Sequence, residues 1–331
     1  MPSPSRCLTA GDAFSLVRDR AGTRPPSNPR VGFELEWLTH PIDDPQRRVT
    51  PPELAAALTS TTLPCGSATS IEPGGQIELS TVPWPSLPAA LDAALVDARV
   101  LRGALRAAGI ATVAAPIDER PARRVVDAPR YRAMEAYFDA FGPEGRTMMC
   151  NTASLQVNVD PVGDPRTAWH AVNLAAALLG DGRRRGVWSA IDPSRTAPVG
   201  GDDVGDAWAS YALAARVMFI RTDADTCTPV LDGTTLGDWL IDGHPLGWPT
   251  ADDVVEHLTT LFPPVRPRGF FEVRTLDAQE DDCWPVVAAA VATIALDPMA
   301  ADELVRTHEP TSDDVLEIAR AAGHRRREAV R

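Results

Sequence analysis

The sequence predicts an α+β fold for this chain of 331 residues. Two observations predict it. Four short segments alternate apolar and polar residues with the two-residue period of a β-strand. Several alanine- and leucine-rich segments begin and end with residues that are typical of helix ends. The length allows a large hydrophobic core, and at about 150 residues per domain it suggests one large domain or two closely packed ones.

The predicted helices follow one another along the chain. Residues 1–30 are rich in Pro and Ser around a short helical pattern over 12–20, and we expect them to form a loosely held lead-in. A clear helix begins at Ser86, because Ser caps helix N-termini and the Pro two residues later suits a first turn. The same signals predict a helix over 164–180. Further helices are expected at 131–141, 206–220, 252–261, 286–296 and 313–322, with Pro-containing loops at 118–129 and 222–233.

The four strand segments each place apolar residues on one face and polar residues on the other, because successive side chains of a strand point to opposite faces. A solvated strand would explain any single segment. The polar faces together carry carboxylates and amides almost exclusively, with a single arginine. The candidate functional residues on these polar faces are Glu34 and Glu36 in 31–37, Gln76 and Glu78 in 74–80, Gln156 and Asn158 in 152–160, and Glu272 and Arg274 in 268–275.

Carboxylates gathered on one face of a sheet repel each other unless a cation holds them, so a bound metal is the simplest explanation. All candidate ligands are oxygen donors, which favour Mg²⁺ or Mn²⁺ over zinc. Mg²⁺ commonly completes its shell with substrate phosphates, and the pattern therefore points to nucleotide-dependent phosphoryl transfer. Gly74 and Gly75 follow Glu72 and would let a ligand approach the backbone, although a plain tight turn explains them equally well.

Composition excludes several classes of function. The net charge of -13 disfavours nucleic-acid binding, which depends on a basic surface. The chain contains no lysine, so it cannot use the lysine of a Walker-type phosphate loop or form a Schiff base. The five scattered cysteines are expected to be reduced thiols. Without a secretion signal or an apolar run of about 18 residues, the sequence favours the cytoplasm and no membrane partner.

Seven motifs resemble, in order, those of the plant-type glutamate-cysteine ligase family: VGFELEW, EPGGQIELS, PRYRAMEAYF, RTMMCNTASLQVNVD, DPSRTAPVG, YALAARVMFI and HLTTLFPPVRPRGFFEVRTLDAQ. The sequence is most similar to the actinobacterial branch that supplies gamma-glutamylcysteine for ergothioneine synthesis. The resemblance implies a glutamine-synthetase-like fold, in which a curved, mainly antiparallel sheet forms a funnel-shaped active site with helices packed outside. Residues 31–331 are accordingly expected to form a single catalytic domain.

The resemblance also implies site residues, with ATP as co-substrate and Mg²⁺ or Mn²⁺ as cofactor. Arg274 is expected to stabilise the transferring phosphoryl group or bind a substrate carboxylate. Glu36 is implied to be a second catalytic residue. Gln156 and Asn158 would contact metal or nucleotide, although a bacterial relative carries histidine at the Gln156 position. The implied metal ligands are Glu34, Glu36, Glu78 and Glu272.

Three further residues are implied to bind substrate. Arg130 and Arg195 resemble arginines that contact glutamate, with structural ion pairs as the alternative. Tyr211, with Trp208, would form a wall on the acceptor side unless both belong to the core. Two features depart from the family pattern: the 179–188 stretch is shorter, and the chain ends soon after the helix at 286–296.

The implied reaction joins the side-chain carboxylate of glutamate to the amine of cysteine. A carboxylate is a poor electrophile, so it first attacks the γ-phosphate of ATP, and the cysteine amine then displaces phosphate from the acyl phosphate. Metal and arginine screen the charges that keep the anions apart. The alternatives are a ligase with a different amine acceptor, a non-catalytic nucleotide- or amino-acid-binding protein, and a metal-dependent hydrolase. The oligomeric state stays open.

Overall fold

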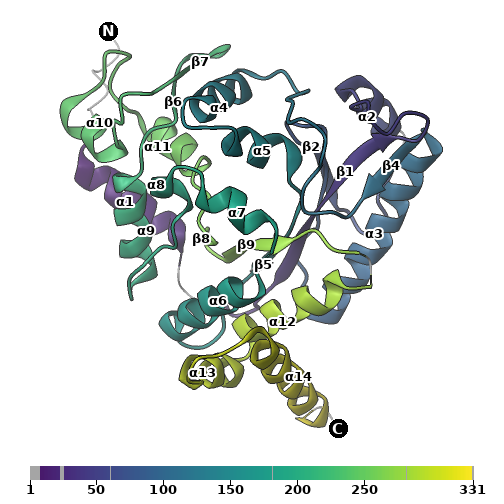
Figure 1. Cartoon of the computed structure of the whole chain (residues 1–331). Helices are drawn as coiled ribbons and strands as arrows, with labels where there is room; N and C mark the ends of the chain where they lie inside the picture. Colours follow the sequence, from purple (N-terminus) through teal and green to yellow (C-terminus); the bar gives the residue numbers. More distant parts are fainter. Residues whose placement is uncertain (1–7, 23–25, 60, 181, 281, 330–331) are drawn as a thin grey trace.

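The computed structural model describes residues 8–22, 26–59, 61–180, 182–280 and 282–329. Its centre is an antiparallel sheet of seven strands in the order β2-β3-β1-β5-β9-β8, with β4 paired to the far end of β1 (Figure 1). The strands are β1 (Val31–Pro41), β2 (Ala68–Ile71), β3 (Ile77–Ser80), β4 (Ile110–Val113), β5 (Ser154–Val159), β8 (Val265–Pro267) and β9 (Phe271–Asp277). A separate hairpin pairs β6 (Phe219–Asp223) with β7 (Thr226–Pro229).

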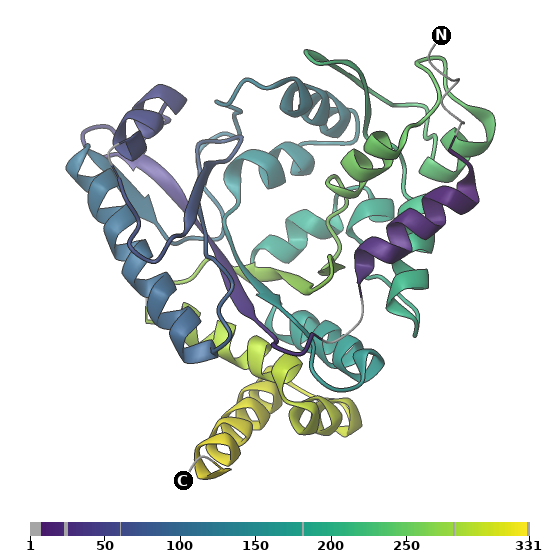
Figure 2. The same ribbon diagram turned by 180° about the vertical axis from the view of Figure 1, so that it is seen from behind.

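One face of the sheet is apolar and is covered by the long helices α3 (Leu87–Ala107), α6 (Pro165–Leu179) and α12 (Trp284–Leu296). Phe33 packs edge-on against Trp284 at 5.6 Å between ring centroids, and Trp169 contacts Phe271 at 5.3 Å. Burial of these large side chains supplies much of the driving force for folding. Outside this layer lie α13 (Pro298–Arg306) and α14 (Ser312–Ala329), which project from the bottom of the molecule (Figures 1 and 2).

The remaining helices lie in three places (Figure 1). The short helices α4, α5, α7 and α8 stand beside the polar face, and α4 also packs on the β6–β7 hairpin. Helices α9, α10 and α11 pack around α1 at one end of the molecule, and α2 packs on α3. The bounds are α1 (Ala10–Ala21), α2 (Pro51–Thr59), α4 (Pro129–Asp139), α5 (Glu144–Asn151), α7 (Arg184–Ser189), α8 (Pro193–Thr196), α9 (Val204–Ala214), α10 (Leu236–Asp242) and α11 (Ala251–Leu258).

The α+β class, the four strand segments and the antiparallel sheet are confirmed. The helix predicted over 206–220 is too long, because α9 ends at Ala214 and the following apolar residues form β6. The loop predicted over 222–233 is partly wrong for the same reason, since it contains β7. The helix in the lead-in is α1, which packs on α9 through buried residues and is not loosely held. Residues 1–7 and 23–25 lie outside the described part.

Within the described ranges, no single helix combines the length and hydropathy needed to cross a bilayer; α12 and α13 reach them only as a pair bent by 96°. The four cysteines that the structure describes, Cys65, Cys150, Cys227 and Cys283, are free thiols, as the sequence predicts.

Candidate active site

The polar residues of four neighbouring strands meet on one face of the sheet. Strands β3, β1, β5 and β9 are adjacent, and residues opposite each other in a ladder point to the same side. The register brings the predicted residues together in pairs: Glu36 with Glu78, Glu34 with Gln156, and Asn158 with Glu272. We call this surface the acidic face. The four carboxylates and two amides that lie far apart in the sequence are thus neighbours in space.

Amide groups hold the two carboxylates of β1. Asn158 Nδ2 donates to Glu34 Oε1 at 2.9 Å, and Gln156 Nε2 donates to Glu36 Oε1 at 3.2 Å. The backbone N–H of Ser154 donates to the other oxygen of Glu36 at 2.7 Å. Burial nevertheless raises the pKa of both Glu34 and Glu36. Both carboxylates therefore favour a further positive charge beyond what these bonds supply.

Two more carboxylates complete the group. The hydroxyls of Ser80 and Ser70 donate to Glu78 Oε1 at 2.8 and 3.1 Å, yet burial and the charge of Glu36 raise the Glu78 pKa. Glu72 lies in the turn before β3. Burial, followed by the charges of Glu36 and Glu78, raises its pKa to about 8. The sequence motif marked this turn for its glycines, and Glu72 was not among the predicted ligands.

Glu272 lies in a different electrostatic environment from the other carboxylates. Its buried side chain accepts hydrogen bonds from Arg266 and, at 2.9 Å, from Arg268 Nη1. Its carboxylate also lies 3.2 Å from Arg274 Nη1. Although burial opposes ionisation, the charges of these arginines, Arg266 first, hold the Glu272 pKa well below its usual range. Its role as a metal ligand stays a prediction, because three guanidiniums already balance its charge here.

The donor set of the acidic face fits a hard divalent cation. All its donors are carboxylate or amide oxygens, and the buried Asn158 Oδ1 has no hydrogen-bond partner among the residues that the structure describes. The excess of negative charge is the second argument, since burial raises the pKa of Glu34, Glu36, Glu72 and Glu78 alike. In the part of the chain that the structure describes, no three His, Cys, Asp or Glu side chains converge as a ready-made metal cluster.

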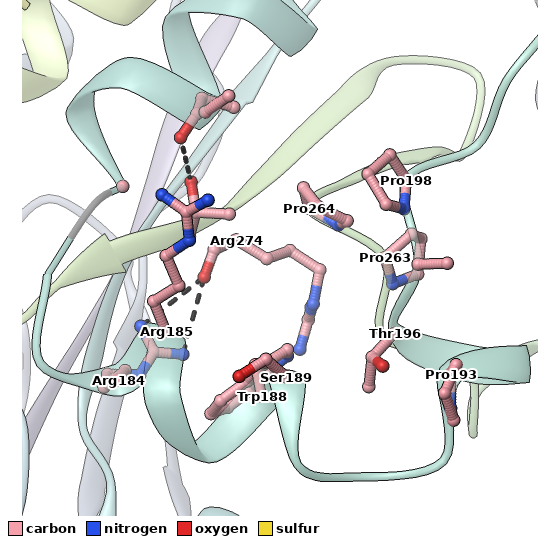
Figure 3. A pocket seen from close by; sticks show the side chains of 15 residues that line it. Arg184, Arg185, Trp188, Ser189, Pro193, Thr196, Pro198, Pro263, Pro264 and Arg274 are labelled. Atoms are coloured by element: carbon pink, nitrogen blue, oxygen red, sulfur yellow. Dashed lines mark hydrogen bonds between the residues drawn. The ribbon is translucent and has the colours of Figure 1, made fainter.

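A pocket of about 340 Å³ adjoins the acidic face (Figure 3). Arg184, Arg185 and Arg274 line one side of it, Trp188 lies at its base, and four prolines and Thr196 line the opposite side. Arg274 belongs to both places, because its Nη1 also donates to Gln156 Oε1 at 2.7 Å. An anionic group bound in the pocket would thus share a guanidinium with the acidic face.

Three predicted substrate-binding residues lie elsewhere. Arg195 is fully buried and bonds Asp192, Thr260, Tyr137 and the Arg216 carbonyl, contacts that favour the structural ion pair.

Arg130 is partly exposed and donates to Thr259 Oγ1 at 3.2 Å. Tyr211 stacks on buried Trp208 with 5.6 Å between ring centroids, as the core alternative expects, but within the described ranges its buried hydroxyl has no hydrogen-bond partner. None of these contacts tests a role in binding, so both roles remain predictions.

Sequence reasoning missed Glu72, Arg184, Arg266 and Arg268. The alternation that identified Glu272 continues backwards through Arg266, which faces Glu272 across the β8–β9 ladder. Recognising the hairpin at Gly269, whose φ of 86° suits glycine, would have predicted that ion pair. Arg184 approaches the sheet from α7, and no local signal in the sequence indicates that contact.

Comparison with known proteins now decides the family. The model of glutamate-cysteine ligase family 2 matches residues 30–180 and 181–331. The chain belongs to this family. Glutamate–cysteine ligase EgtA from Mycobacterium tuberculosis is 40% identical over 316 residues, covering 86% of this chain and 72% of that protein. The protein of the same name from Mycolicibacterium smegmatis is 38% identical over 312 residues, covering 86% and 73%.

Solved structures show more distant similarity to this family member. A bifunctional glutathione synthetase from Pasteurella multocida is 15% identical with a TM-score of 0.42, covering 93% of this chain and 42% of that chain. A protein described as a novel glutamine synthase homolog is 16% identical with a TM-score of 0.36, covering 93% and 65%.

Proposed function

We propose that the protein is an ATP-dependent glutamate-cysteine ligase that forms gamma-glutamylcysteine, for use in ergothioneine biosynthesis. The observation that carries the proposal is the acidic face together with Glu72, where four partly buried carboxylates with raised pKa values adjoin a pocket lined by arginines. Family membership and the names of the mycobacterial relatives support the same activity. ATP hydrolysis drives the ligation, because direct condensation of a carboxylate with an amine is unfavourable in water.

Mg²⁺ would be held by Glu34, Glu36, Glu72 and Glu78, and when bound it would neutralise the charge of the ATP phosphates. The side-chain carboxylate of glutamate attacks the γ-phosphate, giving an acyl phosphate and ADP. The cysteine amine then attacks the acyl carbon, and phosphate leaves. Arg274 contributes a fixed positive charge beside the pocket, which suits the charge that develops on the transferring phosphoryl group.

The pocket beside Arg274 suits one of the amino-acid substrates. Its volume of about 340 Å³ is enough to hold glutamate or cysteine. The guanidinium of Arg274 can donate to a substrate carboxylate, and proline and alanine residues line much of the remaining wall. The pocket contains Pro193 and Thr196 of the DPSRT motif, the segment that the family resemblance places near the substrate.

The test is to incubate the purified chain with ATP, Mg²⁺, glutamate and a panel of amines, and to measure ADP and the mass of the product. Glutamate- and cysteine-dependent ADP release with a gamma-glutamylcysteine product is expected. Release that depends on another amine would show a ligase with a different acceptor. Thermal stabilisation by ATP and glutamate without ADP formation would show a non-catalytic binding protein. Glu78→Gln is the matched negative control, because it removes one carboxylate of the acidic face and keeps the size of the side chain.

A further inference from the structure

Arg184 is a buried arginine to which the proposed reaction gives no role. Its guanidinium stacks on the Trp188 ring, 4.5 Å from the ring centroid. Its Nη1 donates to the Leu276 carbonyl at 2.9 Å, and both Nη1 and Nη2 lie 3.5 Å from the Arg274 carbonyl. The guanidinium is a planar fork of donors, so Arg184 ties together the two carbonyls on either side of Thr275.

These carbonyls belong to a β-bulge in β9. Between the pairs Leu155–Leu276 and Val157–Val273, β5 has one residue and β9 has two. A bulge interrupts the ladder and changes the direction of the side chains around it. Here it returns Leu276 to the apolar face while the preceding Arg274 stays on the acidic face.

Arg274 is one of the two β9 residues that form this bulge. Its Nη1 reaches Gln156 Oε1 at 2.7 Å on the strand opposite and Glu272 Oε2 at 3.2 Å on its own strand. Its backbone N–H donates to the Pro264 carbonyl at 2.9 Å, which continues the β8–β9 pairing one residue beyond Val265 and Val273. The next residue is tied to α6, because Thr275 Oγ1 donates to the Ala176 carbonyl at 2.9 Å. Without a donor at the Arg274 and Leu276 carbonyls, the bulge would lose the contact that α7 makes with it.

We propose that Arg184 is a positioning residue, which holds the β9 bulge so that Arg274 points across the sheet to Gln156 and Glu272. The inference rests on the proposed function, which gives Arg274 its part in phosphoryl transfer. A purely electrostatic role for Arg184 is the rival explanation, because its charge also opposes the rise that burial causes in the Glu36 pKa. A lysine supplies that charge without the planar fork, so the two roles can be separated.

The experiment compares the kcat and KM of the wild type, Arg184→Met, Arg184→Lys, Arg274→Met and the double methionine variant. We expect Arg184→Met to lower kcat about 10²-fold, the usual effect of losing one preorganised contact, and to leave the KM values within about 3-fold. Arg184→Lys stays at least about 10-fold below the wild type. The double variant is no slower than Arg274→Met, because Arg184 acts through Arg274. Arg183→Met is the matched control and keeps the wild-type rate, since Arg183 is exposed and pairs only with exposed Glu119 at 2.8 Å among the contacts described.

Wild-type activity in Arg184→Lys, or effects that multiply in the double variant, would overturn the proposal. If Arg184→Met does not fold, Trp188→Leu replaces it, because removing the ring frees the guanidinium from the other side. If the wild type itself forms no ligation product, the proposed function fails instead. A crystal structure of Arg184→Lys then decides the positioning role alone: an Arg274 side chain turned away from Gln156 supports it, and an unchanged bulge with the Arg274–Gln156 bond intact refutes it.

Discussion

Replacing Arg195 with methionine should destabilise the protein more than it weakens substrate binding. The Arg195 side chain is fully buried, and its Nε lies 3.2 Å from a buried Asp192 carboxylate oxygen. Removing one partner of a buried ion pair costs about 3–5 kcal/mol, because the other charge is left without compensation. Tyr137 and Ser194 still donate to Asp192, so the lower end is expected. A loss of about 3 kcal/mol corresponds to a fall in Tm of about 4 °C in a chain of this size.

The assay combines thermal unfolding with substrate saturation kinetics measured well below the lower Tm. Asp192→Asn in the Arg195→Met background should recover part of the loss, because no buried charge then lacks a partner. Arg130→Met is the matched control: Arg130 is partly exposed, and its described contacts are a hydrogen bond to the Thr259 hydroxyl and the face of the Tyr131 ring, so the Tm of this variant should stay within about 2 °C of the wild type. An unchanged Tm with a KM for glutamate raised about 10-fold or more would refute the structural role of Arg195 and restore the substrate contact that the family resemblance implies.

Three further predictions concern other parts of the molecule. Glu36→Gln should remain folded and lose at least about 10²-fold in ligation rate. Glu272→Gln should lose activity and also about 3 kcal/mol of stability, because the substitution leaves the guanidiniums around Glu272 without a balancing negative charge. Measuring the ligation rate and the Tm of each variant checks both expectations. Burial lowers the pKa of His257 to about 3, so below about pH 6.5 the unfolded chain binds a proton that the folded protein does not bind. The contribution of neutral His257 to the free energy of unfolding should be fully present above about pH 6.5 and should fall by about 1.4 kcal/mol per pH unit toward about pH 3. Urea titrations at several pH values should show a flatter profile for His257→Asn. Gly74→Ala should destabilise the protein by more than about 2 kcal/mol, because its Cβ would lie 1.9 Å from a backbone carbonyl of α5, whereas Gly103→Ala in the open middle of α3 should stabilise it slightly in the same denaturation assay.

Local patterns were sufficient for most of the secondary structure. Alternation identified the four strands of the acidic face, because one side of each is buried and a shift by one residue would exchange the faces. The segment after Ala214 shows where local reading fails. Its apolar run fits a buried helix or a buried strand equally well, and pairing of Phe219 with Pro229 in the β6–β7 hairpin decides for the strand. That pairing is a tertiary fact that periodicity does not contain.

The candidate site was predictable as a set of strand faces but not as a network of charges. Alternation placed Glu34 and Glu36 on one side of β1, and the register then set them beside residues of β3 and β5. It could not indicate the bulge at Arg274, which adds one residue to β9 without any change in the residue types around it. Nor could it indicate Arg184, because the contact depends on how α7 packs against the sheet.

The protein compensates buried negative charge in two different ways on one sheet face. Glu272 receives arginines from its own hairpin and is balanced within the protein. Glu34, Glu36 and Glu78 receive mainly neutral amides and hydroxyls, and burial leaves the pKa of each raised. An unbalanced arrangement lowers stability, and folds keep such arrangements mainly where function requires them. Glu272, whose charge is balanced, thus fixes the arginines in place. The negative charge of Glu34, Glu36 and Glu78 stays uncompensated within the protein, and a cation bound together with substrate phosphates can balance it.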